Sequence, residues 1–409
     1  MSQPHGPIAT PQIAEDAVRQ RQFSSIPLRI FAVCLTSALV AVNYTNYGPL
    51  IPALRSELHI SNGQAGLFST LLFLGFAVAY IPAGILADRY GSRPILLGSS
   101  ILFVLGELLL PLFPNLTWML ACRAIVGLGS GAAFVAGARV AASLGKHSSV
   151  GQGLYGGSVQ VGSGTGLLVT PLLLAWFGWR GAFFVWGLTG ILSIVVWLFV
   201  NEAQEPRESS RADVGAGLRS PSIWTLGLSH MGTFGLGNAI AAWIAVYLVH
   251  QYGLTLGLAA TLGSVALLTG MFFRPLGGVL IGRGIIAAIP LLRIGTIFGF
   301  LGVLLLALPL RFAPLLIAGM GLIAIGATIP YTSVFNEAAH VRGVSKGIGQ
   351  ALVSVISIPT VLLGPPLVGF LFQQTGSFTP AFGSILLFSA VAVTASFLAG
   401  PAVKRETTA

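Results

Sequence analysis

The chain alternates between long apolar runs and short breaks that are rich in Gly, Pro and charged residues. A helix that crosses the hydrocarbon core of a bilayer needs about 20 largely apolar residues. The pattern therefore predicts an all-α membrane protein with twelve transmembrane helices. The predicted helices cover residues 28–53, 66–87, 95–112, 117–143, 151–174, 181–200, 222–248, 257–281, 291–310, 314–337, 348–371 and 379–400.

The longest polar stretch between the runs divides the helices into two sets of six. Residues 201–221 form this stretch and are predicted to be a cytoplasmic linker between an N-terminal bundle, 28–200, and a C-terminal bundle, 222–400. The remaining segments, 1–27 and 401–409, are expected to be cytoplasmic tails. The first of them has no apolar core of the signal-peptide type, so the first helix is expected to be retained.

A weak internal repeat relates the two halves. The sequence Gly-Ile-Leu-Ala-Asp-Arg at 84–89 is echoed by Gly-Val-Leu-Ile-Gly-Arg at 278–283. Duplicated six-helix halves enclose a substrate path at their interface, and rocking of one half against the other exposes that path to each side in turn. The repeat therefore predicts two pseudo-symmetric six-helix bundles and a transporter.

Composition excludes a water-soluble fold. Hydrophobic residues make up 55% of the chain and charged residues only 8%, whereas about a quarter of the residues of a soluble domain are charged. The mean hydropathy is correspondingly high, at +0.87. The surface of the protein is therefore expected to face the lipid bilayer.

The formal net charge of +10 would suggest nucleic-acid binding in a soluble protein. Here Lys and Arg gather in the segments that lie inside if the N-terminus is cytoplasmic, while the outside loops hold only Arg55, Arg180 and Arg311. This asymmetry is the one that the positive-inside rule describes. It predicts cytoplasmic termini in a bacterial inner membrane and explains the charge without nucleic acid.

The sequence gives no reason to expect a metal, a cofactor or a catalytic centre. Cys34 and Cys122 both fall inside apolar runs and are expected to be packing residues. We find no convincing zinc, phosphate-binding or nucleophile-elbow motif. An enzyme is therefore not expected, and a membrane-embedded enzyme is the least favoured class.

Several motifs resemble one transporter family. The loop at 84–93, Gly-Ile-Leu-Ala-Asp-Arg-Tyr-Gly-Ser-Arg, resembles the signature between the second and third helices of the major facilitator superfamily. In that family the loop acts as a conformational latch between the halves, which implies gating roles for Asp88, Arg89 and Arg93. Arg123, followed by Gly127, resembles a further family element in the fourth helix.

Two further similarities concern anions. The run from Cys122 through Arg139 to Gln160 is similar to the organic-anion symporter branch, in which an arginine at the position of Arg139 takes part in anion binding or coupling. That branch usually carries an Asp-Arg pair in the first helix, where this chain has Asn46 and Tyr47. Arg-Pro-Leu-Gly-Gly at 274–278 resembles the eighth helix of nitrate and nitrite porters and of some monocarboxylate carriers.

An arginine or glutamate inside the membrane is costly unless it faces protein, water or a partner, so each is a functional candidate. Arg274 lies too deep to reach the headgroups easily, and its planar guanidinium suits an oxyanion, so a substrate-facing role is predicted. Arg139 is predicted either to bind anions or to form an inner gate with Glu337; the alternative is that its side chain extends to the headgroups. Arg123 is expected to be structural or gating, and Glu107 to lie at the membrane interface.

Coupling candidates are Glu337 and His230, because each can change its protonation state when its surroundings change. For His230 the alternative is a hydrogen-bonded packing residue. Polar and aromatic residues near the middle of the predicted cavity helices are candidates for the substrate path, and core packing is the alternative for each. These residues are Asn43, Tyr44, Tyr47, Gln160, Asn238, Trp243, Tyr331 and Asn336.

Together these features predict a monomeric secondary transporter that moves a small organic or inorganic anion by alternating access, with protons as the candidate coupling ion. The first alternative is a proton-driven exporter of drugs or metabolites. A second, of another class, is a receptor or sensor that binds without transport. Arg274 separates the anion carrier from an exporter of uncharged compounds, because only the former depends on its charge.

Overall fold

The computed structural model describes residues 25–143, 148–201, 214–338, 340–344 and 346–408. Within these residues all regular structure is helical. The N-terminal half contains α2 (Ile26–Thr45), η1 (Gly48–Leu50), α3 (Ile51–Leu58), α4 (Asn62–Tyr90), α5 (Ser92–Leu109), η2 (Leu110–Leu112), α6 (Leu116–Ala142) and α7 (Ser148–Phe199). The C-terminal half contains α8 (Val214–Arg219), α9 (Pro221–His230), η4 (Met231–Gly235), α10 (Leu236–Tyr252), α11 (Leu256–Leu268), α12 (Gly270–Gly282), α13 (Ala288–Ala307), α14 (Ala313–Gly326), α15 (Tyr331–Ala338), α16 (Lys346–Ser357), α17 (Pro359–Thr375) and α18 (Phe378–Thr408).

The described residues contain 11 helical spans that are long and apolar enough to cross a membrane. One of them, Gly151–Phe199, has 49 residues, which at 1.5 Å per residue is about 74 Å, more than twice the thickness of the hydrocarbon core. At Gly178 the backbone takes φ 67° and ψ 178°, a conformation that reverses the direction of α7. This span is therefore two crossings, and the twelve predicted crossings are confirmed.

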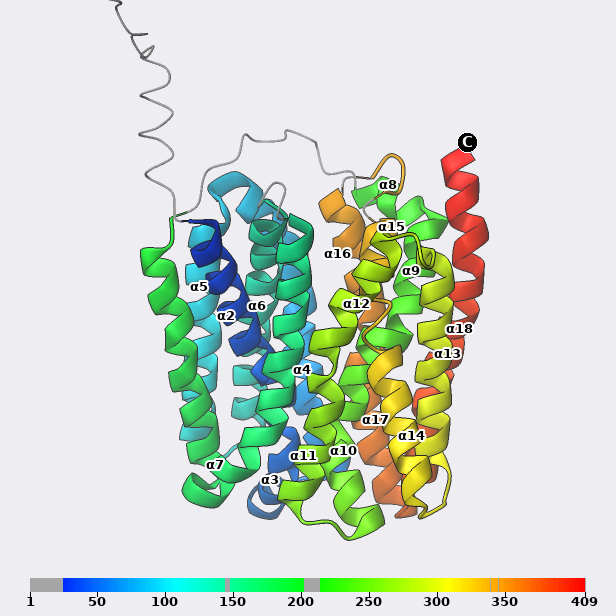
Figure 1. Ribbon diagram of the computed structural model, residues 1–409. Coiled ribbons are helices and arrows are strands. Elements are labelled where there is room, and N and C mark those ends of the chain that lie inside the picture. The colour runs from blue at the N-terminus through cyan, green and yellow to red at the C-terminus, as the bar shows by residue number, and fades with distance from the viewer. Residues whose placement is uncertain (1–24, 144–147, 202–213, 339, 345, 409) are drawn as a thin grey trace, which may run out of the picture.

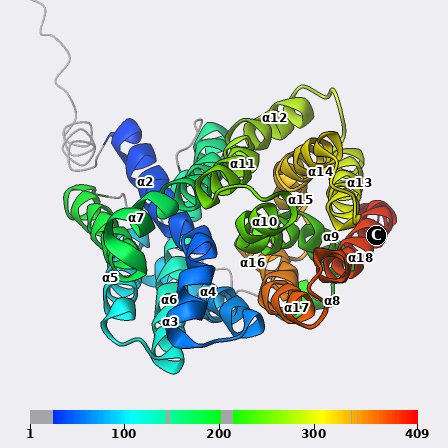
Figure 2. The same cartoon turned by 90° about the horizontal axis from the view of Figure 1, so that it is seen from below.

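Two bundles lie side by side, one formed by α2–α7 and the other by α9–α18 (Figures 1 and 2). We call the edge at which α2 begins and α18 ends the α8 side, and the opposite edge the α3 side, after the short helices that lie there in Figure 1. The α18 helix continues through Thr408, so the segment that was predicted as a C-terminal tail from 401 is helical to that residue.

The two halves repeat one another in detail. Arg93, at the start of α5, donates from Nε to the carbonyl of Trp197 near the end of α7, at 3.0 Å. Arg293, near the start of α13, donates from Nε to the carbonyl of Ser396 in α18, at 3.3 Å. Each arginine therefore ties the third crossing of its half to the sixth, and the pseudo-symmetry expected from the sequence repeat is present.

The halves meet through α4 against α17 and α7 against α11 and α12. Gly66 of α4 lies against the backbone of Pro366 in α17, with no room for a side chain between them. Nearby, the backbone N–H of Asn62 donates to Oε1 of Gln373 at 3.0 Å. The α3 side of the interface is thus closed by direct contact between the halves.

Candidate functional site

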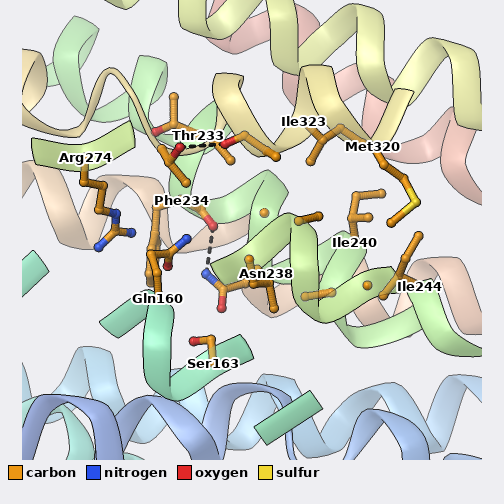
Figure 3. A pocket seen from close by; sticks show the side chains of 18 of the residues that line it. Gln160, Ser163, Thr233, Phe234, Asn238, Ile240, Ile244, Arg274, Met320 and Ile323 are labelled. Atoms are coloured by element: carbon orange, nitrogen blue, oxygen red, sulfur yellow. Dashed lines mark hydrogen bonds between the residues drawn. The ribbon is translucent and has the colours of Figure 1, made fainter. Parts of the chain in front are cut away.

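A large cavity lies where α7 meets the C-terminal half, with about 620 Å³ of empty space that includes open solvent. The N-terminal half contributes Gln160 and Ser163, both from α7 (Figure 3). The rest of the wall comes from the C-terminal half. These residues are Thr233, Phe234, Gly237, Asn238, Ile240, Ala241, Ile244, Gly263, Ala266, Leu267, Arg274, Leu306, Met320, Ile323, Ala324, Ala327 and Thr328.

Three interrupted helices surround this cavity. The α9–α10 crossing contains the π-helical turn η4, α11 ends and α12 begins around Thr269, and α14 and α15 are separated by 327–330. Within a bilayer, irregular backbone is tolerated where it faces protein or lines a cavity. The spans predicted at 257–281 and 314–337 as continuous helices are therefore each broken beside the cavity, and Pro330 lies in the second break.

Arg274 of α12 reaches the cavity with only 4% of its surface exposed. Its Nη1 donates to the carbonyl of Gly156 in α7 at 2.8 Å, and its guanidinium carbon lies 4.4 Å from the ring centroid of Tyr331. Nε is buried without a hydrogen-bond partner. Among the described residues no carboxylate lies within ion-pairing distance of Arg274, so its charge is not neutralised.

A second, smaller cavity of about 340 Å³ shares Arg274 and Phe234 with the first. Its wall is mainly aromatic. The other lining residues are Phe76, Tyr80, Phe134, Val159, His230, Tyr331, Phe335 and Ser354. His230 is buried there; its Nδ1 lies 2.7 Å from the Thr233 hydroxyl, and its ring stacks on Phe234 with centroids 5.7 Å apart. Arg274 thus lies between an aromatic cavity and the larger one.

Arg123, unlike Arg274, has both a carboxylate partner and several hydrogen-bond acceptors around its guanidinium group. It is fully buried inside the N-terminal half, where it pairs with Glu107 of α5 at 3.7 Å. It also donates to the carbonyl of Asn43 at 2.6 Å and to Oδ1 of Asn46 at 3.3 Å, and it lies over the ring of Tyr47. A buried charge with this many partners fits a structural role.

The expectation for Glu107 was wrong. Only 1% of its surface is exposed, and besides Arg123 it accepts a hydrogen bond from Asn46 of α2. It therefore does not lie at the membrane interface. The cause is that one face of α5 packs on α6, which carries Arg123, so a residue on a peripheral helix still points into the bundle.

The structure brings some of the predicted path residues together and separates the others. Gln160, Asn238 and Arg274 line the large cavity, and His230 and Tyr331 line the smaller one. The remaining residues lie elsewhere. Asn43 and Tyr47 contact Arg123, and Tyr44 packs on Phe73 and Phe76. Trp243 is fully buried and donates a hydrogen bond to the carbonyl of Pro365. Asn336 is exposed.

Apart from Arg123, the predicted gating residues belong to segments that lie toward the α8 side. Arg139 and Glu337 are both partly exposed, and within the described residues they form no ion pair with each other in this conformation. Arg89 is exposed and lies over the ring of Tyr90. Arg93 donates to the last carbonyls of α7. The side chain of Asp88 falls outside the described part of the chain.

Sequence reasoning missed much of the cavity wall, including Thr233, Phe234, Met320 and Ile323. Apolar residues such as Phe234, Met320 and Ile323 also fill cores and face lipid, so their type carries no signal. One signal was available, because Gly232, Gly235 and Gly237 cluster beside His230, and glycine weakens a helix. That cluster coincides with the π-helical turn of η4.

Comparison with known proteins gives relatives across most of the chain. The nitrite extrusion protein of Bacillus subtilis (strain 168) is 26% identical over 345 residues, which are 81% of this chain and 84% of the relative. Probable anion transporter 4, chloroplastic, of Oryza sativa subsp. japonica is 27% identical over 308 residues, 67% of this chain. The aligned region spans about half (51%) of the rice protein.

A crystal structure of a bacterial homolog of the human lysosomal transporter Spinster, in an inward-facing and occupied conformation, has the same fold. It superposes with a TM-score of 0.72 at 18% identity, covering 92% of this chain and 98% of that one. The family model of the Major Facilitator Superfamily matches residues 33–361. With this match, the two six-helix bundles and the cavity between them, the chain belongs to the Major Facilitator Superfamily.

Proposed function

We propose that this protein is a secondary active transporter that moves a small anion across the membrane by alternating access, with Arg274 as the group that binds the anion. The observation that carries this proposal is the buried, unneutralised guanidinium of Arg274, which lines both cavities. Arginine stays charged in proteins, and an uncompensated buried charge is costly. An anionic substrate would supply the missing partner.

The free edge of the guanidinium supports the same role. Nη1 is used by Gly156, whereas Nε is buried without a partner. Nε and Nη2 form the edge of arginine that binds a carboxylate or similar oxyanion through two parallel hydrogen bonds. The names of the two relatives, a nitrite extrusion protein and a probable anion transporter, point to the same class of substrate.

For the transport cycle we propose that the α8 side is cytoplasmic, as the excess of Lys and Arg at that edge favours, and that the membrane is a bacterial inner membrane. With the α3 side closed, the substrate would exchange with the α8 side. Closure of that side would bring Arg139 and Glu337 together. Protons are the proposed coupling ion, with Glu337 and His230 as candidate carriers.

The test uses purified protein and a panel of acetate, hexanoate, nitrate, ascorbate and phosphate, with hexanamide as an uncharged probe. At least one anion should raise the melting temperature, and Arg274→Gln should abolish the effect. Arg180→Gln is the matched control, because Arg180 pairs with Glu57 at the surface, where their side chains are 51% and 44% exposed. This variant should respond like the wild type.

The stabilising anion is then radiolabelled for counterflow in proteoliposomes. Exchange that depends on Arg274 supports the anion transporter. Stabilisation by no member of the panel, or equal stabilisation by hexanamide, contradicts the proposal. Binding without counterflow instead identifies a receptor.

A further inference from the structure

The large cavity is polar at one end and apolar at the other. Gln160 and Asn238 lie near Arg274 on one side of Figure 3, while Ile244 and Met320 lie on the opposite side. Asn238 is held in place because its Nδ2 donates to the carbonyl of Phe234 at 2.8 Å. A ligand that fills this space therefore meets hydrogen-bonding groups at one end of its length and hydrocarbon at the other.

The apolar end is open because its wall includes small residues. Ala241 and Ala324 stand at positions in this wall where larger side chains would reduce the space, and Gly263 lets Ile244 and Leu167 pack closely against its helix. The space between these side chains, part of it open to solvent, continues from Arg274 past Ile244 and Met320. A nitrate or nitrite ion would occupy only the end beside Arg274 and leave the rest empty.

The charge of the wall limits the charge of the ligand. Arg274 is the one charged side chain among the described residues that line the large cavity. One anionic group of the ligand can pair with Arg274. A second anionic group would lie against Ile244, Met320 and Ile323 without a partner. An unpaired charge in such surroundings is strongly unfavourable.

Resting on the proposed function, we infer that the substrate is a monocarboxylate with an apolar body. Its carboxylate binds the free edge of the Arg274 guanidinium, and its body extends along α10 and α14 into the apolar end of the cavity. Each methylene that moves from water into this end contributes about 0.8 kcal/mol, which corresponds to roughly a fourfold gain in affinity.

The test compares the binding of acetate, butyrate, hexanoate, adipate and nitrate to purified full-length protein by calorimetry. Affinity should rise about fourfold per methylene from acetate to hexanoate. Adipate has the length of hexanoate but a second carboxylate, and it should bind at least about tenfold more weakly because that charge is unpaired. Nitrate should also bind at least about tenfold more weakly than hexanoate, because it leaves the apolar end of the cavity unfilled.

A variant that fills the apolar end of the large cavity tests where the apolar body of the ligand binds. Ala324→Leu should weaken hexanoate binding by about tenfold or more and leave acetate within about twofold, because it fills the apolar end without touching Arg274. Ala318→Leu is the matched control, since Ala318 lies on the same helix and is exposed. This variant should bind the whole series like the wild type.

The outcomes separate this inference from the proposed function. The inference of an apolar body is overturned if acetate, nitrate or adipate binds as tightly as hexanoate, or if Ala324→Leu leaves hexanoate binding unchanged. Either result leaves the proposed anion site at Arg274 standing. Hexanoate binding that survives Arg274→Gln, or that hexanamide matches, overturns the anion site itself. If Ala324→Leu does not fold, Ala327→Leu, at a half-buried position in the same wall, takes its place.

Discussion

Arg274 and Gly156 connect the two halves of the protein, because Nη1 of Arg274 donates to the Gly156 carbonyl at 2.8 Å. The arginine belongs to α12 and the glycine to α7, so the same side chain lines the cavities and spans the interface that must open and close during transport. Tyr331 supports the arrangement from α15, with its ring 4.4 Å from the guanidinium carbon. Ligand binding and relative movement of the halves are therefore linked at this point.

A methyl group at position 156 should weaken ligand binding. A Cβ at Gly156 would lie 3.2 Å from Cε1 of Tyr331, so the ring must shift and disturb its contact with Arg274. We expect Gly156→Ala to reduce hexanoate affinity by roughly fivefold, since a desolvated cation–π contact contributes about 1–2 kcal/mol. Gly153→Ala is the control, because a Cβ there meets no atom within 4 Å, and calorimetry should find unchanged affinity. Equal affinities for both variants would contradict this link.

The Arg123–Glu107 pair should be important for stability. Glu107→Leu leaves the buried charge of Arg123 unpaired, and we expect it to lower the free energy of unfolding by about 3–5 kcal/mol. The double variant Glu107→Leu with Arg123→Met should recover much of that loss, because no buried charge remains. Unfolding in mixed detergent micelles measures both changes.

The control for this pair is Glu57→Gln, which weakens the exposed ion pair with Arg180 and should cost no more than about 1 kcal/mol. A double variant as unstable as Glu107→Leu alone would show that the penalty does not come from the unpaired charge.

A covalent bridge across the α3 side should stop transport. Asn62 and Gln373 are joined by a 3.0 Å hydrogen bond from one half to the other. In a background with Cys34 and Cys122 replaced by Ser, we expect Asn62→Cys with Gln373→Cys to lose nearly all counterflow after treatment with a short bifunctional thiol reagent. Cleavage of the reagent by reductant should restore it. Each single-cysteine variant serves as a control, and full counterflow by the bridged protein would rule out opening at this side.

The proposed gate on the α8 side is tested by exchanging charges. Arg139→Glu and Glu337→Arg should each reduce proteoliposome counterflow severalfold, since like charges repel when that side closes. The double exchange should restore most of the rate if the two side chains meet in the closed state. If the double exchange does not restore counterflow, the proposal that Arg139 and Glu337 pair in the closed state is wrong.

The crossings could be predicted from the sequence because the length of an apolar run is a direct consequence of bilayer thickness. Arg274 could be singled out as a candidate for the cavity wall because a charged residue deep inside an apolar run is costly unless it faces protein or water. Glu107 was misplaced, since nothing in its own helix reveals that Asn46 and Arg123 face it from two others. Asn238 and Asn43 could not be separated either: both are asparagines in apolar helices, and only packing puts Asn238 in the cavity wall.

The three interrupted crossings described around the cavity belong to the C-terminal half, whereas α4 and α6 of the N-terminal half run unbroken for 29 and 27 residues. Backbone amides beside a break lack the regular partners of a continuous helix and open more readily. Amide hydrogen exchange should consequently be faster around η4, Thr269 and 327–330 than in the middle of α4 and α6. A bound substrate would slow it there, while the central helices of the other bundle keep their protection throughout the cycle.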